Sequence, residues 1–261
     1  MSPTDMISYC IACYRPRYAR ALIDELIRKT TVGFEILLWI NVADTAFDEF
    51  VKQREANGAP IRVIGRTPEN IGMAAYFHLF AQSRFEMVTQ IDDDVVCVSP
   101  RIAETAHEIF TRFPQLGMLT ADVWQDDFTT GARPPMEQYQ TYNSEYGLYD
   151  GPIDGWFAVY RKASLGVCRY IRPSRYLCLG LMLKRLLRRN GLLGLLCTRM
   201  KVFHVIGPQY ASYFGMLDFE IEKYRSLGRG EIVQWYVDAR DKLPPRASLH
   251  ERVLEIQASM S

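Results

Sequence analysis

The 261-residue sequence lacks the marks of a secreted, disulfide-stabilised or membrane-spanning protein. Of its six cysteines only Cys10 and Cys13 lie close together. On the strand predicted there, residues three apart face opposite sides, so we expect no shared zinc site or redox pair. The first residues, MSPTDMIS, carry no basic leader or apolar core, and no run is long and apolar enough to span a bilayer. We therefore expect reduced thiols and a cytoplasmic protein.

Acidic residues are also missing from one long segment, since none occurs between Asp154 and Asp218. The whole chain is nearly neutral, with 31 Lys plus Arg against 30 Asp plus Glu, and gives no reason to expect a nucleic acid partner. Eleven of the basic residues nevertheless fall in the acid-free segment, which we expect to face something anionic. They are Arg161, Lys162, Arg169, Arg172, Arg175, Lys184, Arg185, Arg188, Arg189, Arg199 and Lys201.

The first 123 residues alternate apolar strands with amphipathic helices. The predicted strands are Ile7–Cys13, Phe34–Val42, Ile61–Ile64, the run ending at Ile91 and one near Met118–Val123. The predicted helices are one carrying Tyr18 to Ile27, Asp48–Glu55, one following Asn70 through Ala81, and Pro100–Arg112. This order predicts one α/β domain whose parallel sheet binds ligands beyond the carboxyl ends of its strands. At or just beyond such ends lie Tyr14, Asn41, Asn70 and the aspartates at 92–94.

Three consecutive aspartates, Asp92, Asp93 and Asp94, end the apolar run that starts at Phe85. Adjacent carboxylates repel one another and are costly to desolvate, so an apolar strand that delivers three of them indicates a divalent metal site. The alternative is a solvated acidic turn before the next helix, with Ser99 and Pro100 as its N-cap and first residue. Capping accounts for Ser99 but not for the aspartates.

The second half of the chain is less regular. The aromatic segment Trp124–Asp150 predicts a binding loop or lid, or else a surface excursion with a small core of its own. The strand-like segment Ile153–Tyr160 follows, with Asp154 near its beginning. The basic, leucine-rich segment Tyr176–Met200 is typical of a helix on an anionic membrane, or of two core-packing helices that turn at Asn190. A short strand from Lys201 to Pro208 then presents His204.

The order of these motifs resembles the GT-A glycosyltransferases, especially the family 2-like group, over roughly Ile7 to Pro208. The matching stretches are YCIACYRPR, EILLWINVAD, ENIGMAAY, QIDDDVV, DGWFAVYRK and FHVIG. The resemblance implies a Rossmann-like α/β fold with a mixed, mostly parallel sheet flanked by helices. It implies one domain over 1–261, with a nucleotide-sugar-binding half at 1–123, an acceptor half at 124–217 containing a basic helical insertion at 176–200, and a C-terminal helical tail at 218–261.

The resemblance also implies a nucleotide-sugar donor, such as a UDP- or GDP-sugar, and a glycan or lipid-linked acceptor. By this likeness Ala12, Tyr14, Arg15, Asn41, Asn70 and Gly72 bind the nucleotide, and Asp92 or Asp93 reaches its ribose. Asp92, Asp94 and His204 would hold Mn²⁺ or Mg²⁺, which suits oxygen ligands with one imidazole. Simpler interpretations are a packed histidine at 204, a helix cap at Asn70 and Gly72, and a solvated Arg15. The acid-free segment would face the donor diphosphate, a lipid-pyrophosphate acceptor or an anionic bilayer, the last implying peripheral binding at the inner membrane face.

The catalytic base is the point where the chain departs from the family. Inverting members use a carboxylate soon after the acceptor segment, and here that region is free of acids. We expect Asp154 to serve, with Gly155 admitting the acceptor and Trp156 stacking on a sugar, although Asp154 is also placed to cap a turn. The other candidates are Asp126, Asp127, Asp150, Asp218 and Glu220.

Two other functions fit the same motifs. A haloacid dehalogenase-like phosphohydrolase would use Asp92 as nucleophile and Asp94 as general acid, but its motif normally lies near the start of the chain. A non-catalytic nucleotide-binding module would bind a donor without turnover.

Overall fold

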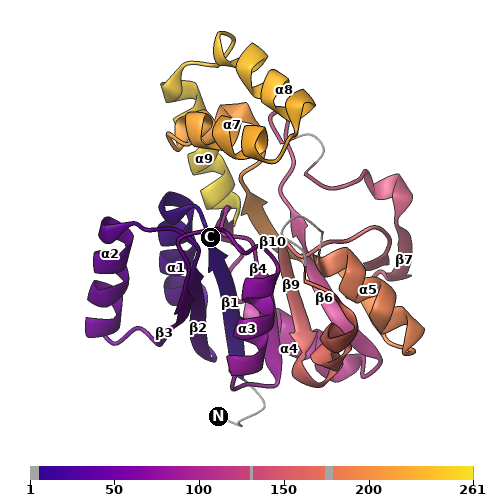
Figure 1. Cartoon of the computed structure of the whole chain (residues 1–261). Helices are drawn as coiled ribbons and strands as arrows, with labels where there is room; N and C mark the ends of the chain where they lie inside the picture. Colours follow the sequence, from indigo (N-terminus) through magenta and orange to yellow (C-terminus); the bar gives the residue numbers. More distant parts are fainter. Residues whose placement is uncertain (1–5, 130–131, 174–178, 261) are drawn as a thin grey trace.

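The computed structural model describes residues 6–129, 132–173 and 179–260, which build one ten-stranded sheet with flanking helices (Figure 1). The strands are β1 (Met6–Cys13), β2 (Gly33–Ile40), β3 (Ile61–Arg66), β4 (Met87–Ile91), β5 (Val95–Val98), β6 (Leu116–Val123), β7 (Gln140–Asn143), β8 (Leu148–Asp150), β9 (Phe157–Arg161) and β10 (Leu193–His204). The helices are α1 (Pro16–Lys29), α2 (Thr45–Ala56), α3 (Ala74–Gln82), α4 (Ile102–Arg112), α5 (Leu179–Arg189), α6 (Pro208–Tyr213), α7 (Leu217–Ser226), α8 (Gly230–Arg240) and α9 (Arg246–Ser259), with 3₁₀ segments η2 (Met136–Gln138) and η3 (Lys162–Tyr170).

The sheet has the order β3-β2-β1-β4-β9-β6-β10-β8-β7, and β5 pairs with β10 outside this path. Neighbours from β3 to β4 are parallel, as are β6 and β10, whereas β9 runs antiparallel between β4 and β6. Every residue of β4, β5 and β6 is buried, which explains why these strands read as continuous apolar runs. The mixed, mostly parallel α/β sheet is therefore confirmed.

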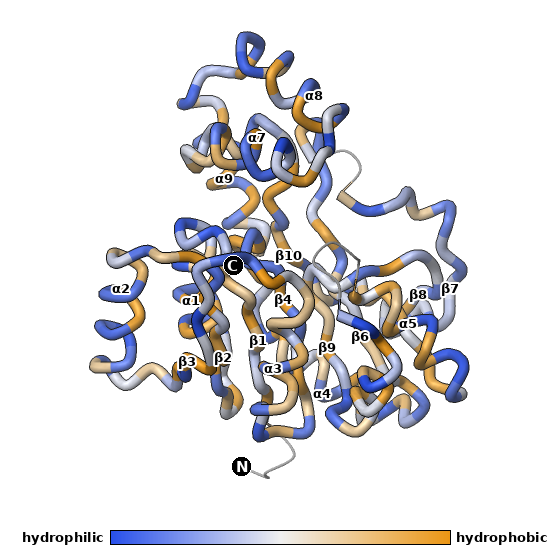
Figure 2. Tube along the Cα trace, viewed as in Figure 1, coloured by the Kyte–Doolittle hydropathy of each residue, from blue (hydrophilic) through white to orange (hydrophobic). Residues whose placement is uncertain are grey.

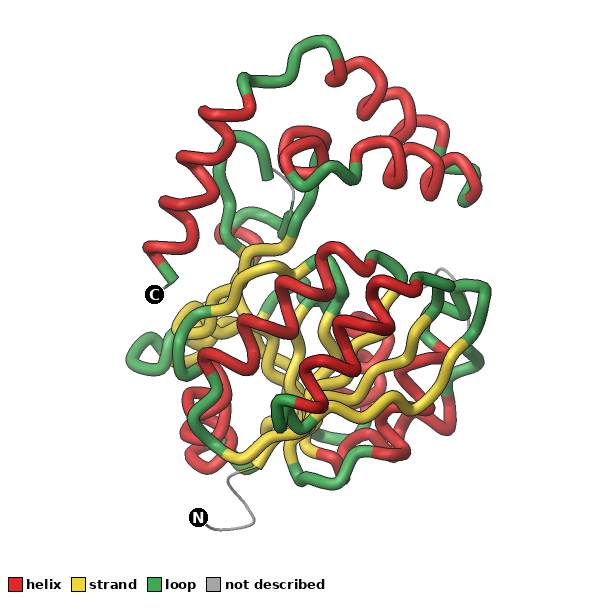
Figure 3. Tube along the Cα trace, turned by 90° about the vertical axis from the view of Figure 1, so that its left-hand side faces the viewer, coloured by secondary structure: helices red, strands yellow, loops and turns green. Residues whose placement is uncertain are grey.

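Figure 2 shows hydrophobic residues along the central strands and hydrophilic ones on the outer helices. The helices α6 to α9 lie above the carboxyl ends of the parallel strands in Figure 1, and Figure 3 shows them beyond the same edge of the sheet. Their link to the sheet includes Lys29 of α1, whose Nζ donates to Val98 O at 2.7 Å and to Met260 O at 2.8 Å. The C-terminal helices therefore cover the edge at which we expect ligands.

Two local predictions are wrong. The helical interpretation of 176–200 holds only for α5, because Leu193 to Met200 belong to the long strand β10; residues 174–178 lie outside the described part. Gly191 ends α5 with φ of 74°, and the apolar run after it, fully buried at Leu195 and Leu196, pairs with β6 and β8. Ser99 does not cap α4, because its Oγ accepts the backbone N–H of Lys201 at 3.0 Å.

Part of the aromatic segment Trp124–Asp150 belongs to the sheet. Its hairpin of β7 and β8 extends the sheet beyond β10. Tyr139 is buried, and its hydroxyl donates to Pro152 O at 2.5 Å. Among the described residues, no helix has the length and apolar character needed to cross a membrane.

Candidate active site

The three aspartates form the tight turn between β4 and β5. Asp92 N–H donates to Trp156 O at 2.9 Å, and Val95 N–H donates back to Asp92 O at 3.1 Å. The chain therefore reverses at the carboxyl end of β4, and the three carboxylates lie under the C-terminal helices. This is the position predicted from the apolar run, although the short strand β5 after it was not foreseen.

Asp92, Asp94 and His204 converge in space. One ligand atom from each lies within 4.8 Å of the other two, and His204 Nε2 is 2.9 Å from Asp94 Oδ1. The antiparallel pairing of His204 with Val95 carries the imidazole to the aspartate turn. Its Nδ1 is buried without a hydrogen-bond partner in the described part of the chain, and such an unpartnered ring nitrogen fits a metal-binding site. Two carboxylates and one imidazole fit a hard divalent cation.

The pKa values of Asp92 and Asp94 are shifted in opposite directions. Desolvation, reinforced by the Asp94 charge, raises the pKa of Asp92 to about 7. Burial also acts to raise the pKa of Asp94, but Arg15 and His204 outweigh it and hold that pKa below its usual value. The pKa of His204 is raised, since the Asp94 carboxylate outweighs burial, which acts to lower it. The charge of Asp92 therefore changes near neutral pH.

Asp93 anchors the loop between β1 and α1. Its Oδ2 accepts the backbone N–H groups of Tyr14 at 2.6 Å and Arg15 at 2.5 Å, and its Oδ1 accepts from the Arg15 guanidinium. Both oxygens of Asp93 therefore hold the loop between β1 and α1 in place, whether or not a ribose hydroxyl adds a further bond.

Arg15 bridges the aspartates to the C-terminal helices. Its Nη1 lies 3.1 Å from Asp94 Oδ2, and its Nε lies 2.7 Å from Glu220 Oε1 on α7. Glu220 is only 4% exposed, and its other oxygen is 2.5 Å from Lys223 Nζ. The interpretation of Arg15 as a solvated side chain is therefore wrong. Sequence reasoning missed Lys223, because only the fold brings α7 over the aspartates.

The other residues predicted to bind the nucleotide brace neighbouring loops. Asn41 is 1% exposed, and its Oδ1 accepts from Thr67 Oγ1 at 3.0 Å and Ile71 N at 3.3 Å. Its Nδ2 is buried without a partner among the described residues. Asn70 Oδ1 accepts the N–H of Gly72, whose φ of +59° favours glycine.

The end of β1 also lies at this edge of the sheet. Ala12 there is half-buried, and the ring of Tyr14 packs against Phe219 of α7 with centroids 5.2 Å apart. Of the predicted nucleotide-binding residues, Tyr14 and Arg15 therefore contact α7 directly.

Asp154 lies in the loop before β9, and its side chain contacts the first turn of α5. Its Oδ1 accepts the N–H groups of Gly155 at 2.8 Å and Leu181 at 3.2 Å, so one oxygen caps the helix and its own turn. Its charge is among those that raise the pKa of Asp92, although desolvation and Asp94 act more strongly. Asp154 is therefore within electrostatic range of the proposed metal ligands.

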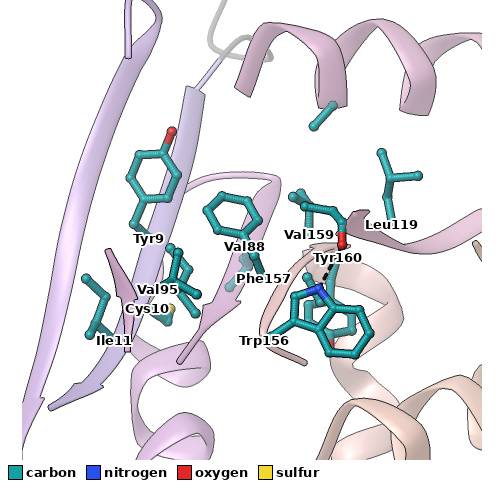
Figure 4. Packing of buried hydrophobic residues seen from close by; sticks show 14 of the residues in the cluster. Tyr9, Cys10, Ile11, Val88, Val95, Leu119, Trp156, Phe157, Val159 and Tyr160 are labelled. Carbon is teal, nitrogen blue, oxygen red and sulfur yellow. Dashed lines mark hydrogen bonds between the residues drawn. The ribbon is translucent and has the colours of Figure 1, made fainter. Parts of the chain in front are cut away.

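Gly155 and Trp156 are packed rather than open. A Cβ at Gly155 would lie 2.0 Å from Gln90 Nε2, so a glycine is required against that side chain. Trp156 is 7% exposed among the buried side chains of Figure 4, and its Nε1 donates to Ala121 O at 2.7 Å. A sugar that stacks on this indole would need the core to open.

The comparisons with known proteins agree on the fold. No protein-family model and no curated sequence matches the chain. Solved structures do: Staphylococcus aureus TarS 1–349 in complex with UDP-GlcNAc (13% identity, TM-score 0.59, 79% of this chain and 61% of that one) and the mannosyltransferase PcManGT from Pyrobaculum calidifontis in complex with GDP-Man and Mn²⁺ (11%, 0.61, 92% and 66%). A mycobacterial protein is also similar (16%, 0.53, 79% and 69%). The chain spans 61–66% of the length of the first two. These similarities show that the chain has the GT-A fold.

Proposed function

We propose that this GT-A chain is a metal-dependent glycosyltransferase that moves a sugar from a nucleotide-sugar donor to an acceptor hydroxyl. The observation that carries the proposal is the convergence of Asp92, Asp94 and His204 at the carboxyl edge of the sheet. Ligands of such sheets bind at that edge. The proposal draws further support from solved structures of the same fold that hold UDP-GlcNAc, or GDP-Man with Mn²⁺.

The donor's leaving group explains why the site needs a cation. Departure of a nucleoside diphosphate builds negative charge, and bound Mn²⁺ or Mg²⁺ would neutralise it as a Lewis acid. Asp92 and Asp94 would supply carboxylate oxygens and His204 one ring nitrogen. Asp92 must lose its proton for this role, which its pKa of about 7 permits near neutral pH.

Two protein cations are proposed to bind the diphosphate. Arg15 and Lys223 flank Glu220 above the aspartates, and both side chains are largely buried. When a donor binds, each would exchange part of its contact with Glu220 for a phosphate oxygen. Phosphate recognition by a buried Arg and Lys is stronger than the same contact in water.

The acceptor side is proposed to be built around Asp154. This carboxylate would take the proton from an acceptor hydroxyl of a glycan or lipid-linked acceptor while its Oδ1 is held by Gly155 and Leu181. Its Oδ2 accepts no hydrogen bond from the described residues, which suits a proton acceptor.

A thermal-shift panel tests the proposal. UDP and GDP should each be added with and without Mn²⁺, and at least one should raise the melting temperature only when the metal is present. Titration of the same pair into Asp94→Asn should show no metal-dependent shift. A protein that binds neither the metal nor any nucleoside diphosphate would refute the proposal.

Two assays separate the rival functions. Release of phosphate from a generic phosphomonoester, lost in Asp92→Asn, would favour the phosphohydrolase. Metal-dependent nucleotide binding, without hydrolysis or transfer from any sugar donor, would favour a binding module.

A further inference from the structure

We propose that the outer face of α5 and the adjoining end of η3 form a docking surface for an anionic membrane. This surface, the basic face, consists of Arg169, Arg172, Arg185, Arg188 and Arg189, all of which are exposed. It is independent of the proposed transferase chemistry, and its test requires neither donor nor turnover.

The spacing on α5 places three of these arginines together. Arg185, Arg188 and Arg189 stand at i, i+3 and i+4, so they share one side of the helix. Leu183 and Leu187 occupy the opposite side and are buried. The 3₁₀ segment η3 packs against α5, and it adds Arg169 in its last turn and Arg172 just beyond its end. Figure 1 shows α5 on the outer flank of the sheet, beside β6.

The charge of the basic face is hardly compensated by the protein. Among the described residues only Arg188 has a carboxylate within 4.0 Å, that of Asp150, which Lys184 already contacts at 2.7 Å. The other described cations of the acid-free segment have partners: Arg199 pairs with Glu108, Lys201 lies 3.7 Å from Asp122, and Arg161 and Lys162 donate to backbone carbonyls. Among the described cations of this segment, the uncompensated charge is therefore concentrated on this one surface.

Apolar groups beside the arginines favour a bilayer over a soluble polyanion. Tyr170 is 64% exposed, and the Arg169 guanidinium lies 4.8 Å from its ring centroid. Exposed aromatic rings beside basic residues are typical of membrane interfaces. Leu181, Met182 and Leu186 are half-buried on the same helix. Anionic headgroups would bind the guanidinium groups while these side chains meet the acyl boundary.

The basic face is also separate from the aspartate site. The N-terminal end of α5 contacts Asp154, whereas Arg185, Arg188 and Arg189 lie in the last two turns of this eleven-residue helix. At 1.5 Å per residue the helix is about 16 Å long. The arginines of α5 therefore lie toward the end of the helix that is away from Asp154.

Vesicle flotation tests the proposal. The whole protein is mixed with vesicles of phosphatidylcholine alone or with phosphatidylglycerol added, at low and at high salt. We expect flotation only with phosphatidylglycerol, reduced by high salt. The variant R185Q/R188Q/R189Q should lower the partition coefficient by tenfold or more, since each basic residue near an anionic surface contributes about fivefold. Adding Tyr170→Ala to this triple variant should lower the partition coefficient further.

The control is R225Q/R229Q/R240Q, which removes the same charge from exposed arginines on the C-terminal helices. It should float like the unchanged protein, and circular dichroism should show both triple variants folded. Equal losses in the two would overturn the proposal, because net charge alone would then explain binding. Absence of flotation at low salt, or equally tight binding to soluble polyphosphate with no effect of Tyr170→Ala, would overturn it as well.

Discussion

His204 Nε2 lies 2.9 Å from Asp94 Oδ1, although 110 positions separate the two residues in the chain. The contact exists because β10 pairs antiparallel with β5, the strand that follows the aspartate turn. A histidine at the end of one strand and a carboxylate at the start of another thereby form part of the same site. Four predictions follow from the arrangement around them.

His204→Ala should weaken Mn²⁺ binding at least tenfold, because it removes one of three converging ligand atoms. Mn²⁺ binding can be measured by electron paramagnetic resonance or calorimetry without a donor. His250→Ala is the matched control, since His250 is exposed and contacts Tyr213 instead. An unchanged metal titration in His204→Ala would remove this histidine from the site.

Asp92→Asn should stabilise the metal-free protein at pH 8. The folded pKa of Asp92 is about 7 against an ordinary value of 3.8, so the folded state holds the proton more tightly. The contribution of this group to stability is present below pH 4 and is lost as the pH rises through 7. The advantage of Asn should therefore shrink as the pH falls from 8 to 4.

Urea unfolding at several pH values measures this effect. Asp218→Asn, at a carboxylate whose side chain is 89% exposed, should show no such trend. Saturating Mn²⁺ should stabilise the unchanged protein but not Asp92→Asn. A constant difference between Asp92→Asn and the unchanged protein from pH 4 to 8 would contradict the raised pKa.

The sheet and the aspartate turn could be predicted because their signals are local. β1, β2 and β4 are apolar runs that end in polar residues, and burial on both faces makes such runs continuous. The proposed metal ligands Asp92 and Asp94 could be predicted because adjacent carboxylates repel one another and are costly to desolvate. His204 needed the family resemblance, since a single histidine at the end of a strand carries no signal of its own.

The failures share a tertiary origin. The leucines on every side of Leu193 to Met200 favour a helix when only the sequence is considered. The segment is a strand because its backbone pairs with β6 and β8. The Glu220–Lys223 pair sits on a helix that nothing local links to the aspartates. Ser99 has the residue type of a helix cap, but the adjacent β10 backbone competes for its hydroxyl.

Glu220→Gln should destabilise the protein by about 3 kcal/mol, because removing one partner of a buried ion pair leaves the others uncompensated. Glu220 lies between Arg15 and Lys223, and its side chain is 6% exposed. Glu222→Gln on the same helix is the control: its side chain is 68% exposed and pairs with exposed Arg225, so a change below about 0.5 kcal/mol is expected. Equal effects of the two substitutions in urea unfolding would show that Glu220 does not link α7 to the site.

Asp154→Asn should lower sugar transfer by a hundredfold or more, because general base catalysis typically contributes about 10²–10⁴ in rate. Asparagine keeps the oxygen that accepts from Gly155 and Leu181, so the start of α5 and the stability of the fold should be preserved. Binding of donor and Mn²⁺, measured by calorimetry, should also be unchanged, which separates a lost base from a damaged site.

Asp150→Asn is the control for Asp154→Asn. Asp150 is one of the other candidate bases, but its Oδ1 lies 2.7 Å from Lys184 Nζ and its Oδ2 lies 4.0 Å from Arg188 Nη1, so both oxygens face cations of α5. It should retain most activity. If Asp154→Asn also retains most activity, the base is another residue or the sugar is transferred with retention, and the anomeric configuration of the product distinguishes these two. A retained configuration requires no carboxylate to take the acceptor proton in line, so the capping bonds to Gly155 and Leu181 would then be the whole role of Asp154.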